Sequence, residues 1–314
     1  MATDMTDDTA TATTPRVTEL AGGSPPTVLR TGEKLAEEIA GLDALEAHLE
    51  NHPSRARQVW TTVWPKLAAI AIALMAWQAL VWSGWKPTYV FPGPATVLPE
   101  LWDMLGTAKF WTAVSITMRR ALAGYALALV IGSVLGIAVA RSRVLRSAVG
   151  SLITGLQTMP SIAWFPLAIL LFGLTEKAIM FVVVLGAAPS IANGLIAGVD
   201  HVPPLMLRAG RMIGAKGVRL YRHVILPAAL PAYMGGLKQG WAFAWRSLMA
   251  GELLVIVANR PSIGDQLQLS REFSRSDDML ALMIVILVIG IVVDSLFFGT
   301  VERSLARRRG LAQH

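Results

Sequence analysis

Long apolar segments alternate with short polar stretches along most of the chain. About 20 apolar residues cross a bilayer as a helix, and six segments approach or exceed that length. They cover residues 63–81, 121–140, 149–171, 178–199, 230–257 and 279–298. The fifth is the least apolar, because it contains Lys238, Gln239, Arg246 and Glu252. The pattern predicts an all-α integral membrane protein with six transmembrane helices.

The two ends of the chain lack such a segment. Residues 1–32 are rich in Thr, Asp, Pro and Gly and are predicted to be disordered. An amphipathic helix is predicted over residues 33–50, where Leu35, Leu42 and Leu49 recur every seven residues. Two roles are consistent with this helix. It packs on this protein or its partner, or it is a regulatory or dimerising element. We expect a cytoplasmic tail over residues 1–59 without a cleavable signal, a transmembrane domain over 60–305, and a basic tail over 306–314.

Basic residues are distributed unequally between the two sets of segment ends, and cytoplasmic loops carry the excess of Lys and Arg. The richer set holds Arg55, Arg57, Arg141, Arg143, Arg146, Arg208, Arg211, Lys216, Arg219, Arg222, Arg303, Arg307, Arg308 and Arg309. The poorer set holds Lys86, Lys109, Arg119, Arg120, Lys177, Arg260, Arg271 and Arg275. The bias predicts that both termini are cytoplasmic, as is the basic loop between the fourth and fifth segments.

Composition removes several classes of function. The chain is 54% hydrophobic and 16% charged, with a mean hydropathy of +0.53. Its net charge of +7 is explained by cytoplasmic loops, so we expect no nucleic-acid partner. The absence of cysteine excludes disulfides and thiolate metal sites. The five histidines have no metal-binding spacing, and no P-loop or G-x-S-x-G motif occurs. Any activity that consumes energy would therefore draw it from a partner or an ion gradient.

The cytoplasmic loop contains "RAGRMIGAKGVRLYRHVILPAALP", residues 208–231. Pro203-Pro204 suits the first turn of a helix, which Asp200 could cap. Gly214 and Gly217 then predict the end of this helix and a sharp turn. A second helical piece is expected over residues 218–225, stopping at Leu226-Pro227. A basic loop held on anionic lipid is the alternative that this pattern leaves open.

Polar residues inside the spans are candidates for a translocation path. Pro160, Pro166 and Pro189 each free a backbone carbonyl one turn earlier, and irregular backbone is tolerated where it lines a cavity. In the fifth span, residues seven apart share a helix face. The candidates are Gln157, Ser161, Trp164, Asn193, Gln239, Trp245, Arg246 and Glu252. Close helix packing and snorkelling of Lys238 are the competing explanations.

Three stretches carry a resemblance to a known family. The spacing of Gly214, nine residues, Val224, one residue and Leu226-Pro227 resembles the EAA loop of permease subunits of bacterial ABC importers. "LQTMPSIAWFPLAILLFG" (156–173) and "AFAWRSLMAGELL" (242–254) resemble signatures of its nitrate/sulfonate/taurine branch. The likeness extends over residues 60–305. It departs from the family pattern at Arg208, usually Glu, and at Gly210, usually Ala.

The resemblance implies a type I ABC importer permease-like fold in the cell membrane, with a cytoplasmic coupling helix between helices 4 and 5. The residues expected to contact the ATPase are Leu205, Arg208, Ala209, Arg211, Met212, Gly214, Ala215, Val224, Leu226 and Pro227. Expected partners are a second copy of the permease, two ATPase subunits that bind ATP and Mg, and an extracytoplasmic binding protein.

The same resemblance implies that the permease carries no catalytic site and binds no cofactor or metal. The cargo would be a small anion: an aliphatic sulfonate or taurine first, with nitrate, bicarbonate or a pyrimidine precursor as further possibilities. The alternative function is an ion-gradient-driven secondary transporter that uses Glu252 and Arg246. Such a transporter would work alone and would not need a coupling helix.

Overall fold

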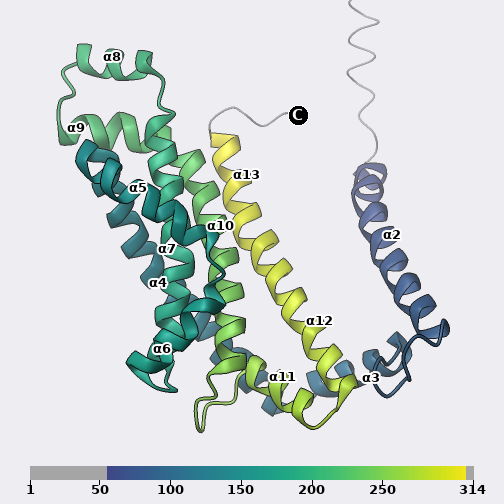
Figure 1. Cartoon of the computed structure of the whole chain (residues 1–314). Helices are drawn as coiled ribbons and strands as arrows, with labels where there is room; N and C mark the ends of the chain where they lie inside the picture. Colours follow the sequence, from purple (N-terminus) through teal and green to yellow (C-terminus); the bar gives the residue numbers. More distant parts are fainter. Residues whose placement is uncertain (1–54, 309–314) are drawn as a thin grey trace, which may run out of the picture. The chain divides into compact units, whose positions relative to one another are not determined.

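A computed structural model describes residues 55–308, and all regular elements within this range are helical (Figure 1). The chain divides into two units, residues 1–71 and 72–314, which are described separately. The helix predicted over residues 33–50 lies outside the described residues. The helices are α2 (Arg55–Trp82), α3 (Pro94–Leu105), α4 (Ala108–Arg141), α5 (Arg143–Thr158), η1 (Ser161–Trp164), α6 (Phe165–Phe172), α7 (Glu176–Asp200), α8 (Pro204–Met212), α9 (Val218–Leu220), η2 (Tyr221–Ile225), α10 (Leu226–Leu254), α11 (Ile263–Glu272), α12 (Ser276–Val293), η3 (Asp294–Phe298) and α13 (Gly299–Arg308).

Four stretches of helix in the described part are long and apolar enough to cross a membrane. They are Val63–Trp82, Ala108–Arg141, Glu176–Asp200 and Ser276–Leu305. The bent pair α5 and α6 provides a fifth candidate. The 29 residues of α10 are also long enough for a span, but its charged residues make it less apolar. The structure therefore supports four to five apolar spans directly.

The third predicted span, residues 149–171, is wrong as a single helix. Its two halves, Val144–Thr158 and Ser161–Phe172, meet at 105°. Met159 and Pro160 both adopt extended backbone angles, with ψ of 131° and 126°. Proline disfavours helical geometry in the preceding residue and donates no hydrogen bond. The chain uses this point to turn, and a short 3₁₀ segment, η1, leads into α6.

The helix α7 lies at the centre of the second unit, packed between α4 and α10. Glycines allow this close approach, because a Cβ on Gly194 would lie 2.5 Å from Cα of Gly236 on α10. Similarly, a Cβ on Gly132 of α4 would lie 2.6 Å from the carbonyl oxygen of Ala188. Small residues at helix interfaces are the usual route to tight packing between spans. These glycines therefore serve the packing of α7 against α4 and α10.

Candidate functional site

The helix α8 begins at the prolines that predicted it. Pro203 is its N-cap and Pro204 its first residue, where the missing N–H costs nothing. The capping role suggested for Asp200 is wrong, because Asp200 is the last residue of α7. Its carboxylate instead lies 2.8 Å from Arg146 of α5. This ion pair joins α5 and α7 beside the segment that leads to α8.

Three glycines shape α8 and the turn after it, for two different reasons. Gly214 and Gly217 have φ angles of +85° and +54°, and neither has an atom within 4 Å of an ideal Cβ. They are required by the backbone conformation and not by lack of space. Gly210 is the opposite case: its Cβ would lie 2.9 Å from Cδ1 of Leu220 and 3.0 Å from Cγ2 of Val224. The departure from Ala at this position lets α8 pack directly on the returning segment.

The returning segment does not stop at Leu226-Pro227, so that prediction is wrong. The helix α9 continues through the π-helical turn η2 into α10, with helical angles at Ile225 and Leu226. Leu226 N–H donates to the carbonyl of Tyr221, five residues earlier. This wider turn accommodates Pro227, which has no N–H of its own. As a result, α9, η2 and α10 form one continuous helix after the glycine turn.

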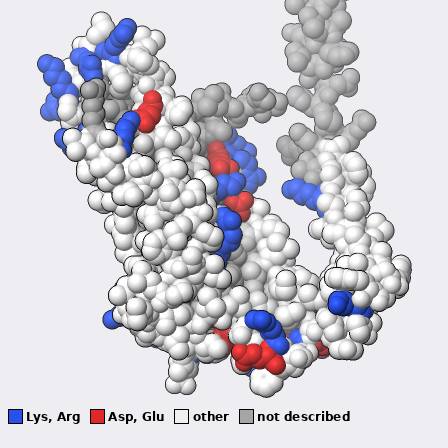
Figure 2. Space-filling model, in the orientation of Figure 1, with Lys and Arg blue, Asp and Glu red and all other residues white. Residues whose placement is uncertain are grey.

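The predicted coupling residues fall into two groups. Ala215 and Val224 are half-buried and pack against the small core of Val202, Leu220 and Ile225. The exposed group comprises Leu205, Arg208, Ala209, Arg211, Met212, Gly214, Leu226 and Pro227. Met212 is 87% exposed, although it is a large apolar side chain. Lys and Arg gather at the end of the molecule that carries α8 and α9 (Figure 2). This end thus presents apolar side chains among positive charge.

Several predicted path residues lie on exposed or half-buried surface of α5, η1, α7 and α10. Gln239 and Arg246 share an exposed stripe of α10 with Ala242. The side-chain amide of Asn193 on α7 donates to that of Gln157 on α5 at 3.3 Å. The half-buried residues Ser161 and Trp164 lie in η1, which packs against α7 and α10.

Arg246 is held by contacts within its own helix. Its Nε donates to the carbonyl of Ala242 at 3.2 Å, and its guanidinium carbon lies 4.6 Å from the ring centroid of Phe243. None of the acidic side chains in the described part of the chain forms an ion pair with it. Its positive charge is therefore oriented, and the described acidic residues do not neutralise it.

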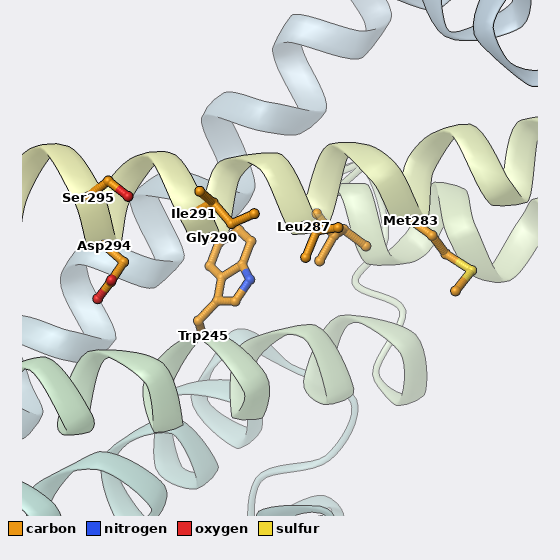
Figure 3. A pocket seen from close by; sticks show the side chains of 8 residues that line it. Trp245, Met283, Leu287, Gly290, Ile291, Asp294 and Ser295 are labelled. Atoms are coloured by element: carbon orange, nitrogen blue, oxygen red, sulfur yellow. The ribbon is translucent and has the colours of Figure 1, made fainter. Parts of the chain in front are cut away.

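Trp245 and Glu252 do not lie on this exposed stripe. Trp245 is 8% exposed and stacks on Trp241 with their ring centroids 6.3 Å apart. It projects from α10 toward Gly290 of α12, in a cavity of about 480 Å³ (Figure 3). The seven-residue spacing did place Trp245 and Glu252 on one face, but that face packs inside the bundle. Lys238, on the same face, lies 3.6 Å from both Asp294 and Glu302.

Glu252 belongs to a buried ionic network that the sequence did not reveal. Its carboxylate has no exposed surface and accepts hydrogen bonds from Thr117 at 2.9 Å, Arg120 at 3.1 Å and the N–H of Gly264 at 3.2 Å. Arg120 is 4% exposed and also contacts Glu176 at 3.2 Å. The only sequence signal for it was an arginine ahead of a long apolar run.

An acidic cluster lies where α3 meets the start of α12. Carboxylate oxygens of Glu100, Asp277 and Asp278 lie within 4.8 Å of one another. Arg275 pairs with Asp278 at 2.9 Å. A hydrogen bond with Asp278, burial, and the charges of nearby acids raise the pKa of Glu100 above its usual value. The ion pair with Arg275 and the easier protonation of Glu100 both reduce this repulsion, and we assign no metal to the cluster.

The chain is similar in sequence to known transport proteins. Residues 128–308 match the family described as "Binding-protein-dependent transport system inner membrane component". An Escherichia coli K12 permease named for aliphatic sulfonates transport is 31% identical over 218 residues, covering 69% of this chain and 82% of its own. The taurine transport system permease protein of the same organism is 28% identical over 252 residues, covering 79% and 90%.

A solved structure shares the fold. It is a chain of the MetNI methionine ABC transporter in inward-facing conformations, with a TM-score of 0.54 and 19% sequence identity. The match covers 63% of this chain and 96% of the other. At this identity the likeness concerns the fold alone, and it agrees with the all-helical architecture described above.

Proposed function

This chain belongs to the binding-protein-dependent transport system inner membrane components, and from that premise we propose that it forms the pathway of an ATP-driven importer of small anions. It is a multi-pass inner membrane permease. Its ATPase partner binds the ATP, and a substrate-binding protein delivers the cargo. The chain itself is not an ATP-hydrolysing enzyme. The alternative of an ion-gradient-driven transporter is wrong in class, because this family works with an ATPase.

We propose that α8 and the glycine turn after it contact the ATPase. The observation that supports this most directly is the exposed apolar surface of Leu205, Met212 and Ile213 beside Arg208 and Arg211. An amphipathic helix of this kind fits a groove on a partner protein, and its basic residues can meet acids on the groove rim. The continuous helix through η2 into α10 gives any movement of α8 a direct route into the membrane domain.

The proposed translocation path follows the exposed stripe of α10, with Gln239 and Arg246, and the linked amides of Gln157 and Asn193. Polar groups in a span usually face a cavity or a protein partner. The described part of one copy leaves this stripe exposed, so we propose that two copies face each other and enclose the path. The two Arg246 side chains would then provide positive charge for an anion. Six spans with cytoplasmic termini, α10 included, complete the proposed arrangement.

Taurine or an aliphatic sulfonate is the proposed cargo, which is consistent with the names of the two Escherichia coli relatives. The test is uptake of labelled taurine into proteoliposomes that contain the permease, its ATPase and its binding protein. We expect uptake that requires ATP inside and the binding protein outside. Competition by alkanesulfonates, nitrate, bicarbonate and orotate identifies the anion class. Uptake by the permease alone under an ion gradient would contradict the proposed function.

A further inference from the structure

The carboxylate of Glu252 joins two helices to the start of a third. Thr117 and Arg120 reach it from α4, Glu252 itself lies near the end of α10, and the N–H of Gly264 reaches it from the first turn of α11. All three donors bind within 3.2 Å, and both carboxylate oxygens are used. Thr117 and Glu252 have no exposed surface. The carboxylate is therefore buried, with hydrogen bonds to both of its oxygens.

The start of α11 depends on this junction for its hydrogen bonds. The first N–H groups of a helix have no partner within the helix. Here Ile263 N–H donates to the hydroxyl of Thr117 at 3.0 Å, and Gly264 N–H donates to Glu252. The hydroxyl of Ser262 takes the N–H of Asp265 at 3.2 Å. A carboxylate at the positive end of a helix is also favoured by the helix dipole.

Gly264 allows this approach and no larger residue does. An ideal Cβ at this position would lie 2.3 Å from Cβ of Glu252 and 3.1 Å from its backbone carbonyl carbon. The clash involves backbone as well as side chain, so it cannot be relieved by a rotamer change. The helices α10 and α11 are thus in van der Waals contact at Gly264 and Glu252. A displacement of one helix therefore requires a displacement of the other.

The charges of the network alternate and extend to the surface. Arg120 lies between Glu252 and Glu176, and Glu176 also binds Arg260 at 3.2 Å. Replacing a buried ion pair by apolar residues is often neutral or stabilising, so stability alone does not account for this network. What the ions provide is a fixed geometry between α4, α7, α10 and the loop that precedes α11.

The position of the junction suggests what this geometry is used for. The helix α10 has the segment from the glycine turn at one end and Glu252 at the other, and Figure 1 shows α8 and α11 at its opposite ends. The residues that follow Ser270, from Arg271 to Arg275, are exposed. In the proposed orientation they face the side from which a binding protein approaches.

We propose that Glu252 is a positioning residue that fixes α11 to α10 and α4, so that binding-protein docking on the α11 side is transmitted along α10 to the ATPase-contacting segment. This inference rests on the proposed function for its orientation and partners. Glu252 does not contact the transported anion and acts through the helix that it holds.

The test uses Glu252→Gln in the complete transporter. Glutamine has the same shape, but one of its two terminal atoms is a donor. That donor must face either Arg120 or the pair Thr117 and Gly264, so one side of the junction is lost in either orientation. We expect the complex to assemble and to retain its basal ATP hydrolysis. Stimulation of ATP hydrolysis by taurine-loaded binding protein should fall about tenfold, as when a charge-assisted hydrogen bond is removed.

A second readout follows α11 directly and needs no partner. Ser270 lies in α11 and is 2% exposed, and the chain has no cysteine of its own. A Ser270→Cys reporter in the full chain should resist maleimide in the otherwise unchanged protein. It should react several-fold faster when Glu252→Gln loosens α11. Glu176→Gln is the matched control, because Arg120 and Arg260 both contact the same oxygen of Glu176, Oε1, and the amide oxygen of glutamine can replace it as acceptor. It should leave both readouts unchanged.

Gly264→Ala provides an independent variant that displaces α11 and keeps every charge. It should reproduce the loss of stimulation and the faster labelling. Unchanged stimulation in Glu252→Gln would overturn the proposal, as would unchanged labelling. If both variants fail to assemble, the junction is a folding element and the positioning role is wrong. A wild-type transporter that ignores its binding protein would instead contradict the proposed function.

Discussion

At the scale of single residues, Arg246 makes the most direct prediction about transport. The structure holds its guanidinium with a backbone carbonyl and the ring of Phe243, and no acid in the described residues neutralises it. A fixed positive charge on a path lowers the barrier to an anion. We expect Arg246→Gln to assemble normally with the ATPase and to transport at least about tenfold more slowly at low substrate concentration. Initial rates in proteoliposomes measure this.

Arg246→Lys is the matched control, because it keeps the charge but lacks the planar group that stacks on Phe243. It should retain most of the transport rate. Normal anion uptake by assembled Arg246→Gln would end the pathway role. Poor assembly of Arg246→Gln with good assembly of Arg246→Lys would indicate a structural role for the charge.

The raised pKa of Glu100 leads to a prediction about how thermal stability depends on pH. Its hydrogen bond with Asp278, its burial and its acidic neighbours raise its pKa in the folded protein. Because the folded protein binds this proton more tightly than the unfolded chain, its stabilising effect is full below the ordinary pKa. It is lost as pH rises through the raised value. Detergent-solubilised protein should therefore gain thermal stability from this residue as pH falls from neutral into the weakly acidic range.

Glu100→Gln separates this effect from other titrations. The amide imitates the protonated acid at every pH. The variant should melt at a higher temperature than the parent near neutral pH and show a weaker pH dependence. Melting curves over a pH series compare the two proteins. An identical pH dependence in both would show that Glu100 does not carry the effect.

At the scale of elements, the glycine turn after α8 is the most sensitive point. Gly214 has a φ of +85°, and nothing lies near its ideal Cβ. A β-branched residue should therefore be disfavoured by backbone strain alone, by about 1–2 kcal/mol. We expect Gly214→Val to leave the membrane helices inserted and to reduce co-purification of the ATPase. Gly214→Asn should recover most of the binding, because Asn tolerates positive φ better than other residues.

Gly150→Ala is a further control for the glycine turn. Gly150 also has free space around an ideal Cβ, but its backbone is ordinary α-helix. The substitution should leave ATPase binding intact. If Gly214→Val binds the ATPase as well as the parent protein does, the turn is not part of the contact.

Element boundaries were predictable where local chemistry decides them. Pro204 and Gly214 marked the two ends of α8, because proline at a first turn and glycine after a last turn act within a few residues. The backbone geometry at the other prolines is not decided by nearby residues alone. Pro160 bends the chain, whereas a π-helical turn carries the helix through Pro227. Whether the chain bends or the helix continues depends on how the neighbouring helices pack against it. The local sequence pattern does not show this packing.

At the scale of the whole molecule, the site was only partly predictable for a similar reason. A seven-residue spacing correctly placed Trp245 and Glu252 on one helix face. It does not say whether that face is covered. The partner of Glu252 is Arg120, 132 positions away, and a contact of that range depends on how α4 and α10 pack. The exposed stripe with Arg246 and the buried face with Glu252 became distinguishable only in the folded arrangement.

The last prediction concerns the orientation of the whole domain, on which the proposed coupling and docking surfaces both depend. The basic residues around α8, and their excess on that side, predict that this end is cytoplasmic. Single cysteines can be labelled cleanly because the chain has none. Thr175, before α7, and Lys216, after α8, are both exposed and lie beyond opposite ends of α7.

In intact cells, an impermeant maleimide should label Thr175→Cys, and it should label Lys216→Cys only after the membrane is opened. Positions 265 and 145 extend the test, with 265 labelling from outside and 145 from inside. Labelling before and after permeabilisation controls for buried cysteines. External labelling of Lys216→Cys would reverse the orientation. The surface assigned to the ATPase would then face away from the cytoplasm, and the proposed route along α10 would have no ATPase at its end.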